Sequence, residues 1–348
     1  MKRGTRVTQK EIAKKAGVTI ATVSMALRED PRLPEATRHR IQKWAIKLGY
    51  RPDPLLSALS SYRQNGGPPK HRGVIAFLKD DFAKVTDYSG IVYSGAERYA
   101  EKMGYRIESF SVNDPEIRPE RLTQIFVSRG IEGLIFGVRL ERNFYQKFGW
   151  ENFSSVTVTR ALDEPKLHLV NPNQTTGSRR VWDEVIGRGY KRIGIVLEER
   201  ADNNVQHRFS FQFWGEQKKS GSEIDKLPLL FLAGKRGNQE AEKQRFTKWF
   251  KRHQPEVIIS YDSEPLCWIK EMGKQIPEEV GFACIKLNEG QKGISGNVQA
   301  VQQVGDSAVQ FLDSIIRSGE RGIPKHHQTL LLDGYWVEGR TLRKKNSY

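Results

Sequence analysis

From residue 73 onward, short apolar runs alternate with amphipathic segments of helical length. The apolar runs lie at 73–78, 133–138, 192–197, 257–260 and 280–285, and helices are expected between them at roughly 89–103, 174–188, 239–253 and 299–318. A strand, a helix and a second parallel strand form a right-handed crossover unit. The alternation therefore predicts an α/β body with parallel sheets.

The first residues follow another pattern, that of short helices joined by a tight turn. Thr8 and Glu11 have the spacing of a capping box, so a helix is predicted to begin just after Thr8. Gly17 can adopt the positive φ that ends this helix, and Thr19 can cap a second one. The pattern predicts helix, tight turn, helix.

A third helix is predicted from Pro34 or Glu35 to Gly49, so three short helices can share one small core. This end of the chain is strongly basic: residues 1–63 hold 14 Lys and Arg against 5 Asp and Glu, whereas the whole chain holds 57 against 41. A dense basic segment suits a polyanion, because binding releases counterions from phosphates. A solvated basic surface is the alternative.

The sequence VTQKEIAKKAGVTIATVSMAL, from Val7 to Leu27, closely resembles the headpiece of the lactose and galactose repressor family. The resemblance continues through Ala36-Thr-Arg38 and Leu48-Gly-Tyr-Arg-Pro-Asp53. It implies an all-α helix-turn-helix headpiece at 1–53 and a hinge helix with its linker at 54–72. The segment 73–348 would then be a two-lobed domain for effector binding and dimerisation.

The resemblance also implies which residues contact DNA. In that family the second helix enters the major groove, and the positions that read base edges are matched here by Ile20, Ala21 and Met25. Apolar side chains favour contacts with thymine methyl groups. Leu59 matches a leucine that wedges into the minor groove. Further phosphate-contacting candidates, each with an ordinary capping or surface role as the alternative, are Thr8, Thr19, Thr22, Ser24, Arg28, Arg32, Thr37 and Tyr50.

The body resembles, more weakly, the family's effector domain, which is related to periplasmic sugar-binding proteins. It implies two doubly wound parallel-sheet lobes, one near 73–162 and 294–325 and the other mostly 163–293, with a ligand cleft between them. The sequence segments that carry this resemblance include Arg129-Gly-Ile-Glu-Gly-Leu-Ile135 and Gly187-Arg-Gly-Tyr-Lys-Arg-Ile-Gly194.

Four residues match polar positions of that cleft: Asn173, Arg208, Asp262 and Lys286. Lys286 departs from the family pattern, because the family usually has an aspartate just after this strand. A lysine here weakens the expectation of a sugar and favours a more anionic effector or a cleft that has lost small-ligand binding.

These features predict a sequence-specific DNA-binding regulator of transcription, most simply a repressor. Such a protein binds a palindromic DNA operator as a homodimer, under the control of a small effector such as a sugar or related metabolite. The alternatives are a solute-binding protein, which the N-terminal segment argues against, and an enzyme. The chain has no P-loop, G-x-S-x-G or H-E-x-x-H motif, so no catalytic residue is predicted.

No cofactor or metal is predicted either, because Cys267 and Cys284 form no C-x-x-C pair and lie in apolar surroundings, where both are expected in the core. The basic N-terminus lacks the apolar stretch of a secretory signal, and no run has the length of a membrane span. A cytoplasmic protein with no membrane partner, associated with the nucleoid through DNA, is therefore expected.

Overall fold

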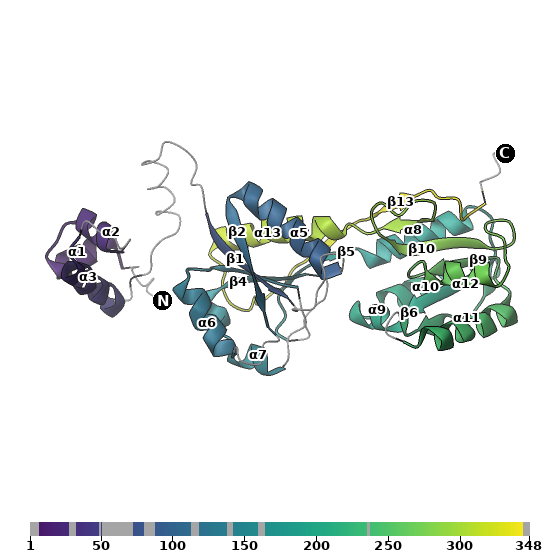
Figure 1. The fold of residues 1–348 in the computed structure, drawn as a ribbon, viewed down its shortest axis with the longest axis horizontal. Helices are drawn as coiled ribbons and strands as arrows, with labels where there is room; N and C mark the ends of the chain where they lie inside the picture. The colour runs from purple at the N-terminus through teal and green to yellow at the C-terminus, as the bar shows by residue number, and fades with distance from the viewer. Residues whose placement is uncertain are drawn as a thin grey trace. The chain divides into compact units, whose positions relative to one another are not determined.

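The computed structural model describes residues 7–27, 33–48, 50, 72–79, 88–112, 118–137, 142–158, 164–234 and 237–343. The chain divides into two compact units, Met1–Arg72 and Gly73–Tyr348, which are described separately (Figure 1). The predictions for Arg28, Arg32, Leu59 and most of the segment 54–72 lie outside the described residues.

In its described residues, the first unit has three helices around one apolar core (Figure 1). The helices are α1 (Gln9–Ala16), α2 (Ile20–Leu27) and α3 (Glu35–Leu48). Each contributes to the same cluster of buried side chains, which includes Ile12, Val23 and Ile41, all fully shielded from solvent.

The junction between α1 and α2 has the predicted local chemistry. The backbone N–H of Thr8 donates to the Glu11 carboxylate over 2.6 Å, which completes a capping box. Gly17 has φ +64°, and the Val18 N–H then donates to the Ala13 carbonyl, so the chain turns within two residues. The Thr19 hydroxyl accepts the Thr22 N–H at the start of α2. The predicted helix, turn and helix are confirmed.

The second unit contains two sheets, called sheet A and sheet B (Figure 1). Sheet A is parallel throughout and has the strand order β12-β5-β4-β3-β1-β2. Its strands are β1 (Gly73–Lys79), β2 (Tyr105–Ser111), β3 (Gly133–Phe136), β4 (Ser154–Val158), β5 (His168–Pro172) and β12 (Thr329–Leu332).

Sheet B has the order β13-β11-β10-β9-β6-β7, with β8 also paired to β6, and only its edge pair β11–β13 is antiparallel. Its strands are β6 (Arg192–Glu198), β7 (Asp225–Lys226), β8 (Leu230–Leu232), β9 (Val257–Ser260), β10 (Gly281–Leu287), β11 (Ser295–Val298) and β13 (Tyr335–Val337). The predicted architecture of two parallel-sheet α/β lobes is confirmed.

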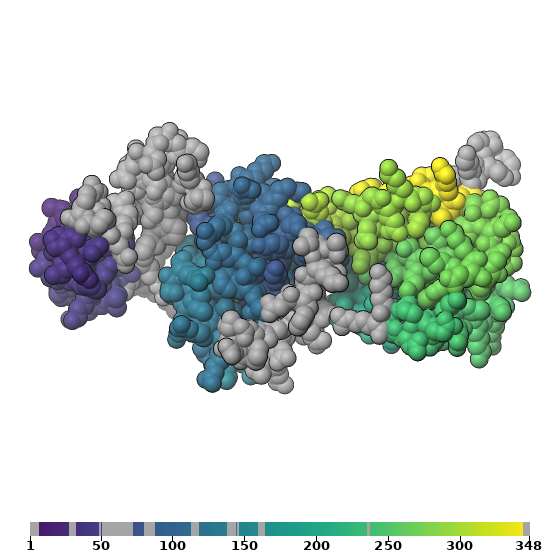
Figure 2. All heavy atoms as spheres, in the orientation of Figure 1, coloured from purple at the N-terminus to yellow at the C-terminus, as the bar shows by residue number. Residues whose placement is uncertain are grey.

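Helices connect the strands of each lobe, and Figure 2 shows the blue early part of the lobe of sheet A and the green part of the lobe of sheet B. With sheet A lie α5 (Tyr88–Met103), α6 (Pro119–Ser128), α7 (Arg142–Lys147), the short 3-10 helix η1 (Trp150–Asn152) and α13 (Val301–Ser318). With sheet B lie α8 (Gln174–Ile186), α9 (Glu199–Asn204), α10 (Arg208–Lys219), α11 (Gln239–His253) and α12 (Glu264–Glu271).

The expected limits of the lobes are wrong at two places. β5 belongs to sheet A although it follows residue 163, and β11 belongs to sheet B although it follows residue 294. We call the lobe built on sheet A lobe A and the lobe built on sheet B lobe B. The chain leaves lobe A at the start of α8 and returns to it after β11. It crosses to lobe B once more between β12 and β13. A strand's apolar pattern does not reveal which of two similar sheets it joins, because either sheet would bury the same side chains.

Candidate functional site

The first candidate surface is the exposed N-terminal end of α2. Thr19, Ile20 and Ala21 are all exposed there, and 49% of the Ile20 surface is accessible to solvent. Ile20 is not a member of the small core behind it, to which α2 contributes Val23 and Ala26. The surface therefore offers apolar groups and two hydroxyls at the positive end of a helix dipole.

The hydroxyl candidates are held in place by local hydrogen bonds. The oxygens of Thr19 and Thr22 lie 2.8 Å apart, and the Thr19 oxygen also accepts the Thr22 N–H over 3.1 Å. Tyr50 accepts a 3.1 Å hydrogen bond from the Gln9 side chain, which connects the end of this unit to α1. The remaining described candidates are exposed Thr8, which caps α1, and the partly buried Ser24, Met25 and Thr37.

The second candidate site is the carboxyl edge of sheet B. The carboxyl ends of parallel strands meet at one edge, and helices that lead back to the amino ends begin there. Asp262 follows β9 and Lys286 lies near the end of β10. Asn173 caps α8, and Arg208 opens α10. The topology thus brings all four predicted cleft residues to the same edge.

Asn173 has a defined structural role at this edge. Its side-chain oxygen accepts the Thr176 N–H over 3.2 Å and so caps α8. Its own N–H donates to the Leu332 carbonyl over 2.8 Å, at the crossing between the lobes. The residue therefore fixes a helix N-terminus, with its partial positive charge, next to the edge of sheet B.

A buried carboxylate holds the backbone that directly follows Arg208. Asp202, 1% exposed, accepts the backbone N–H groups of Phe209 and Ser210 over 3.1 Å each, and it contacts the His207 ring. Gln206 and His207 have φ values of +56° and +59°, two consecutive non-glycine residues in the left-handed region. Backbone strain of this kind is stored where the surrounding structure imposes it, here immediately before Arg208.

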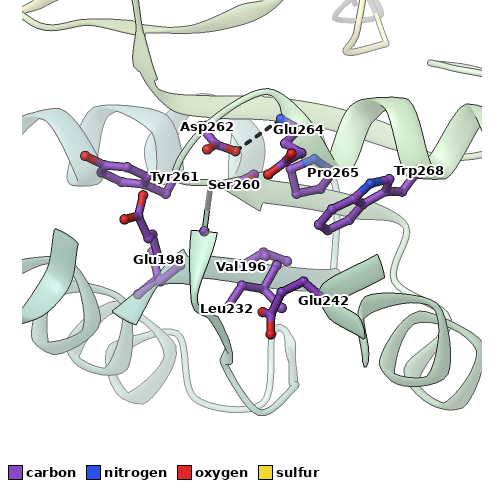
Figure 3. A pocket seen from close by; sticks show the side chains of 12 residues that line it. Val196, Glu198, Leu232, Glu242, Ser260, Tyr261, Asp262, Glu264, Pro265 and Trp268 are labelled. Carbon is purple, nitrogen blue, oxygen red and sulfur yellow. Dashed lines mark hydrogen bonds between the residues drawn. The ribbon is translucent and has the colours of Figure 1, made fainter. Parts of the chain in front are cut away.

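Asp262 lines a pocket that holds about 290 Å³ of empty space, part of it open to solvent. The other three predicted cleft residues do not line this pocket. Figure 3 shows Asp262 and Glu264 together on one side of the pocket. Glu198 lies below Tyr261, and Trp268 lies at the opposite end.

The pocket's acidic groups are partly satisfied by the protein itself. Asp262 accepts the Glu264 N–H over 3.1 Å. Buried Glu242 accepts the Ala233 N–H over 2.8 Å and the Arg245 guanidinium over 3.0 Å. In the described part of the chain, no group of three or more His, Cys, Asp or Glu residues has the arrangement of a metal site.

Lys286 lies between two tyrosine rings. Its Nζ is 5.3 Å from the ring centroid of Tyr261, on its own lobe, and 5.6 Å from that of Tyr88, on α5 of the other lobe. Burial raises the pKa of both phenols, and their mutual proximity raises that of Tyr88 further. Both rings therefore stay neutral in the physiological range and present their π faces to the ammonium.

Sequence reasoning missed Glu198, Tyr261 and Tyr88. The first two end or follow strands of sheet B, so the rule that sites gather at carboxyl ends could have found them. Nothing in the spacing of Tyr88 indicates that it meets a residue almost two hundred positions later. One expectation is wrong: Cys267 is exposed on α12, and only Cys284 is in the core.

No helix in the described ranges is both long and apolar enough to span a membrane.

Comparison with known proteins finds relatives of the N-terminal unit and of the whole chain. The model of the family described as "Bacterial regulatory proteins, lacI family" matches residues 8–53. The chain is 23% identical to the HTH-type transcriptional regulator KdgR of Bacillus subtilis, over 96% of this chain and 97% of that protein. It is 21% identical to the ribose operon repressor of Lactococcus lactis, over 97% and 98% of the two chains.

Solved structures of such regulators share the fold. The lac repressor dimer bound to its operator and the anti-inducer ONPF superposes with a TM-score of 0.59 at 14% identity, over 97% of this chain and 99% of that one. The complex of the regulator CelR with cellobiose gives a TM-score of 0.58 at 15% identity, over 97% and 100%.

Proposed function

We propose that the chain is a helix-turn-helix regulator of transcription of the lacI family, which binds a palindromic operator as a homodimer and represses transcription. One headpiece touches few base pairs, and a twofold pair on a palindrome doubles the readout. The observation that carries the proposal is the exposed end of α2, a helix whose N-terminus offers hydroxyls and an accessible isoleucine next to a capped tight turn.

The contacts within this operator follow from the chemistry of α2. Ile20, Ala21 and Met25 contact thymine methyl groups in the major groove, because they offer no hydrogen-bond donor to guanine. The hydroxyls of Thr8, Thr19, Thr22 and Ser24 bind phosphates, with Thr37 and Tyr50 as further contacts. By resemblance, Arg28 and Arg32 add phosphate contacts and Leu59 enters the minor groove.

The second unit senses the effector at the carboxyl edge of sheet B. Arg208, which opens α10, and Asp262, which lines the pocket, are the proposed polar contacts, together with Asn173 and Lys286. A relative named for the ribose operon and a structure with cellobiose support a sugar or a related metabolite. An effector that prefers one arrangement of the lobes shifts the population that is competent for DNA. Such a regulator acts where the DNA is, so we place it in the cytoplasm.

The test is selection of bound sites from a random DNA pool, followed by a titration of affinity with salt. We expect a palindromic consensus whose affinity falls linearly on a log–log plot, with a slope of about −0.9 per phosphate neutralised. Replacing thymines of the consensus by uracil, which lacks the methyl group, is expected to weaken binding. The matched control is Ile20→Ser, which should reduce the effect of that replacement, because one of the three proposed methyl contacts is lost.

A consensus without twofold symmetry would contradict the homodimer. If replacing thymine by uracil left the affinity unchanged at every position of the half-site, the proposed methyl contacts would be contradicted. The proposed DNA-binding function would not be. No enrichment of any sequence, with or without added metabolites, would overturn the proposed function itself.

A further inference from the structure

An aromatic contact with a cation joins the two lobes of the second unit. Lys286 and Tyr261 belong to lobe B, whereas Tyr88 is the first residue of α5 in lobe A. The Lys286 ammonium lies 5.6 Å from the Tyr88 ring centroid and 5.3 Å from the Tyr261 centroid. Both distances are within the range in which a cation is attracted to an aromatic face.

Each end of this contact is fixed to its own lobe. Tyr88 packs against the apolar cluster that joins sheet A to α5 and α13. Tyr261 packs against the cluster beneath sheet B, and its ring meets that of buried Phe209 at 5.5 Å with an interplanar angle of 69°. The Lys286 N–H donates to the Tyr261 carbonyl over 3.0 Å, so the lysine and the second ring are adjacent by backbone pairing.

The contact therefore links the two lobes. If one lobe rotates away from the other, Tyr261 travels with Lys286 while Tyr88 is left behind, because Tyr88 is anchored in the core of lobe A. Only the Tyr88 half of the contact changes with the angle between the lobes.

We propose that Lys286 is an internal latch, which holds the two lobes against each other through Tyr88 before any effector is bound. The proposal rests on the proposed function, in which the arrangement of the lobes controls DNA binding, and it names the residue that sets that arrangement. The lysine stands where the family pattern has an aspartate, so the chain places a charge of opposite sign at this point of the edge.

The contributions of the Lys286 cation and of the Tyr88 ring can be tested with separate substitutions. A methionine keeps most of the apolar length of lysine but has no charge, whereas an arginine keeps the charge and stacks well on aromatic faces. A phenylalanine at position 88 keeps the π face without the hydroxyl, whereas a leucine removes the face. Lys286→Met and Tyr88→Leu are therefore the releasing variants, and Lys286→Arg and Tyr88→Phe are their matched controls.

The experiment measures the distance between lobes by electron-spin resonance in the full chain without DNA or ligand. Spin labels are placed at Glu101→Cys on α5 and Lys251→Cys on α11, both exposed positions, with the exposed native thiol removed by Cys267→Ser. Labelled protein is diluted with an excess of unlabelled chain, so that a dimer contributes no distances between copies.

We expect the parent protein and the two control variants to share one main distance. In Lys286→Met and Tyr88→Leu a second distance should gain population relative to the first by about tenfold, the effect of losing one partly buried cation–π contact. The double variant should behave like either single one, because each change already breaks the same link.

Unchanged distances in both releasing variants would overturn the latch, as would equal effects of Tyr88→Phe and Tyr88→Leu. Additive effects in the double variant would also overturn it, because the two residues would then act independently. Thermal unfolding of each variant confirms that it is folded before its distances are interpreted. Since no DNA is present, failure of the latch is distinct from failure of the operator-binding function, which the selection of bound sites tests.

Discussion

The three-helix unit and the carboxyl edge of sheet B assemble their candidate residues in opposite ways. Six DNA-contact candidates lie between Thr19 and Met25, at the cap and at exposed or partly buried positions of one short helix. The four cleft candidates come from α8, α10, β10 and the loop after β9, which are far apart in the chain. A surface made by one helix depends on local contacts, whereas a surface made by four elements depends on the packing of a whole lobe.

The comparison also explains why the resemblance is dense in one region and sparse in the other. In the first unit, capping box, turn glycine and cap lie within a dozen residues, so the motif can be read as one string. At the edge of sheet B, Lys286 contacts Tyr88 and Tyr261, partners that no short motif contains.

The largest expected effect tests the packing on which the second unit depends. A Cβ at Gly305 of α13 would lie 2.1 Å from the Val92 carbonyl oxygen and 2.5 Å from the Ala96 nitrogen of α5, and neither backbone atom can move away cheaply. We expect Gly305→Ala to lower the free energy of unfolding by about 3 kcal/mol, measured by chemical denaturation of the full chain.

The matched control is Gly215→Ala on α10, where a Cβ meets nothing within 4 Å. There the alanine should stabilise the protein by about 0.5 to 1 kcal/mol through helix propensity. Equal effects of the two substitutions would show that α5 and α13 do not approach as closely as described.

The next effect concerns the cap of α2. Thr19→Ala removes the oxygen that accepts the Thr22 N–H, at a cost of about 1 kcal/mol, and it also removes the proposed phosphate contact. We expect operator affinity to fall about tenfold, a larger change than the loss of helix stability alone would cause. Thr19→Ser, which keeps the hydroxyl, should retain affinity within about threefold. A serine variant as weak as the alanine variant would exclude the hydroxyl as the contact.

A smaller effect is expected at the corresponding cap in the second unit. Asn173→Ala loses the acceptor for the Thr176 N–H and should lower the free energy of unfolding by about 1 kcal/mol. Asn173→Asp keeps the acceptor and adds a negative charge at the helix N-terminus, so its stability should equal or exceed that of the parent. The affinity of the protein for its operator should not change in either variant when no ligand is present. Loss of stability in the aspartate variant would contradict the cap.

The smallest effect leaves stability untouched and probes burial in the lobe of sheet B. Exposed Cys267 should react with a thiol reagent in the native protein, whereas burial raises the pKa of the Cys284 thiol and keeps it protonated. Because the thiolate is the reactive form, raising the pH from 7 to about 9 should leave the buried Cys284 unreactive. We expect one fast thiol per native chain and two after denaturation. Two fast thiols in the native protein would contradict the core position of Cys284.

Much of the fold was predictable from local patterns. The helix 239–253 has the expected ends, because Asn238 caps it and its apolar face, with Phe246 and Phe250, has helical spacing. The strands at 73, 133, 192, 257 and 280 were predicted to within one or two residues of their ends. Strands such as β2, with polar residues at alternate positions, were not predicted, since an edge strand buries only part of its surface.

The sequence by itself determined the local chemistry of this protein: where helices begin and end, which side chains α2 exposes, and that strands and helices alternate in the body. These features depend on hydrogen bonds and side chains within a few residues of one another. Only the tertiary structure decided which sheet β5 and β11 join and that Lys286 meets Tyr88. The physical reason is that these contacts join distant segments, whose encounter is set by the packing of complete lobes rather than by any local pattern.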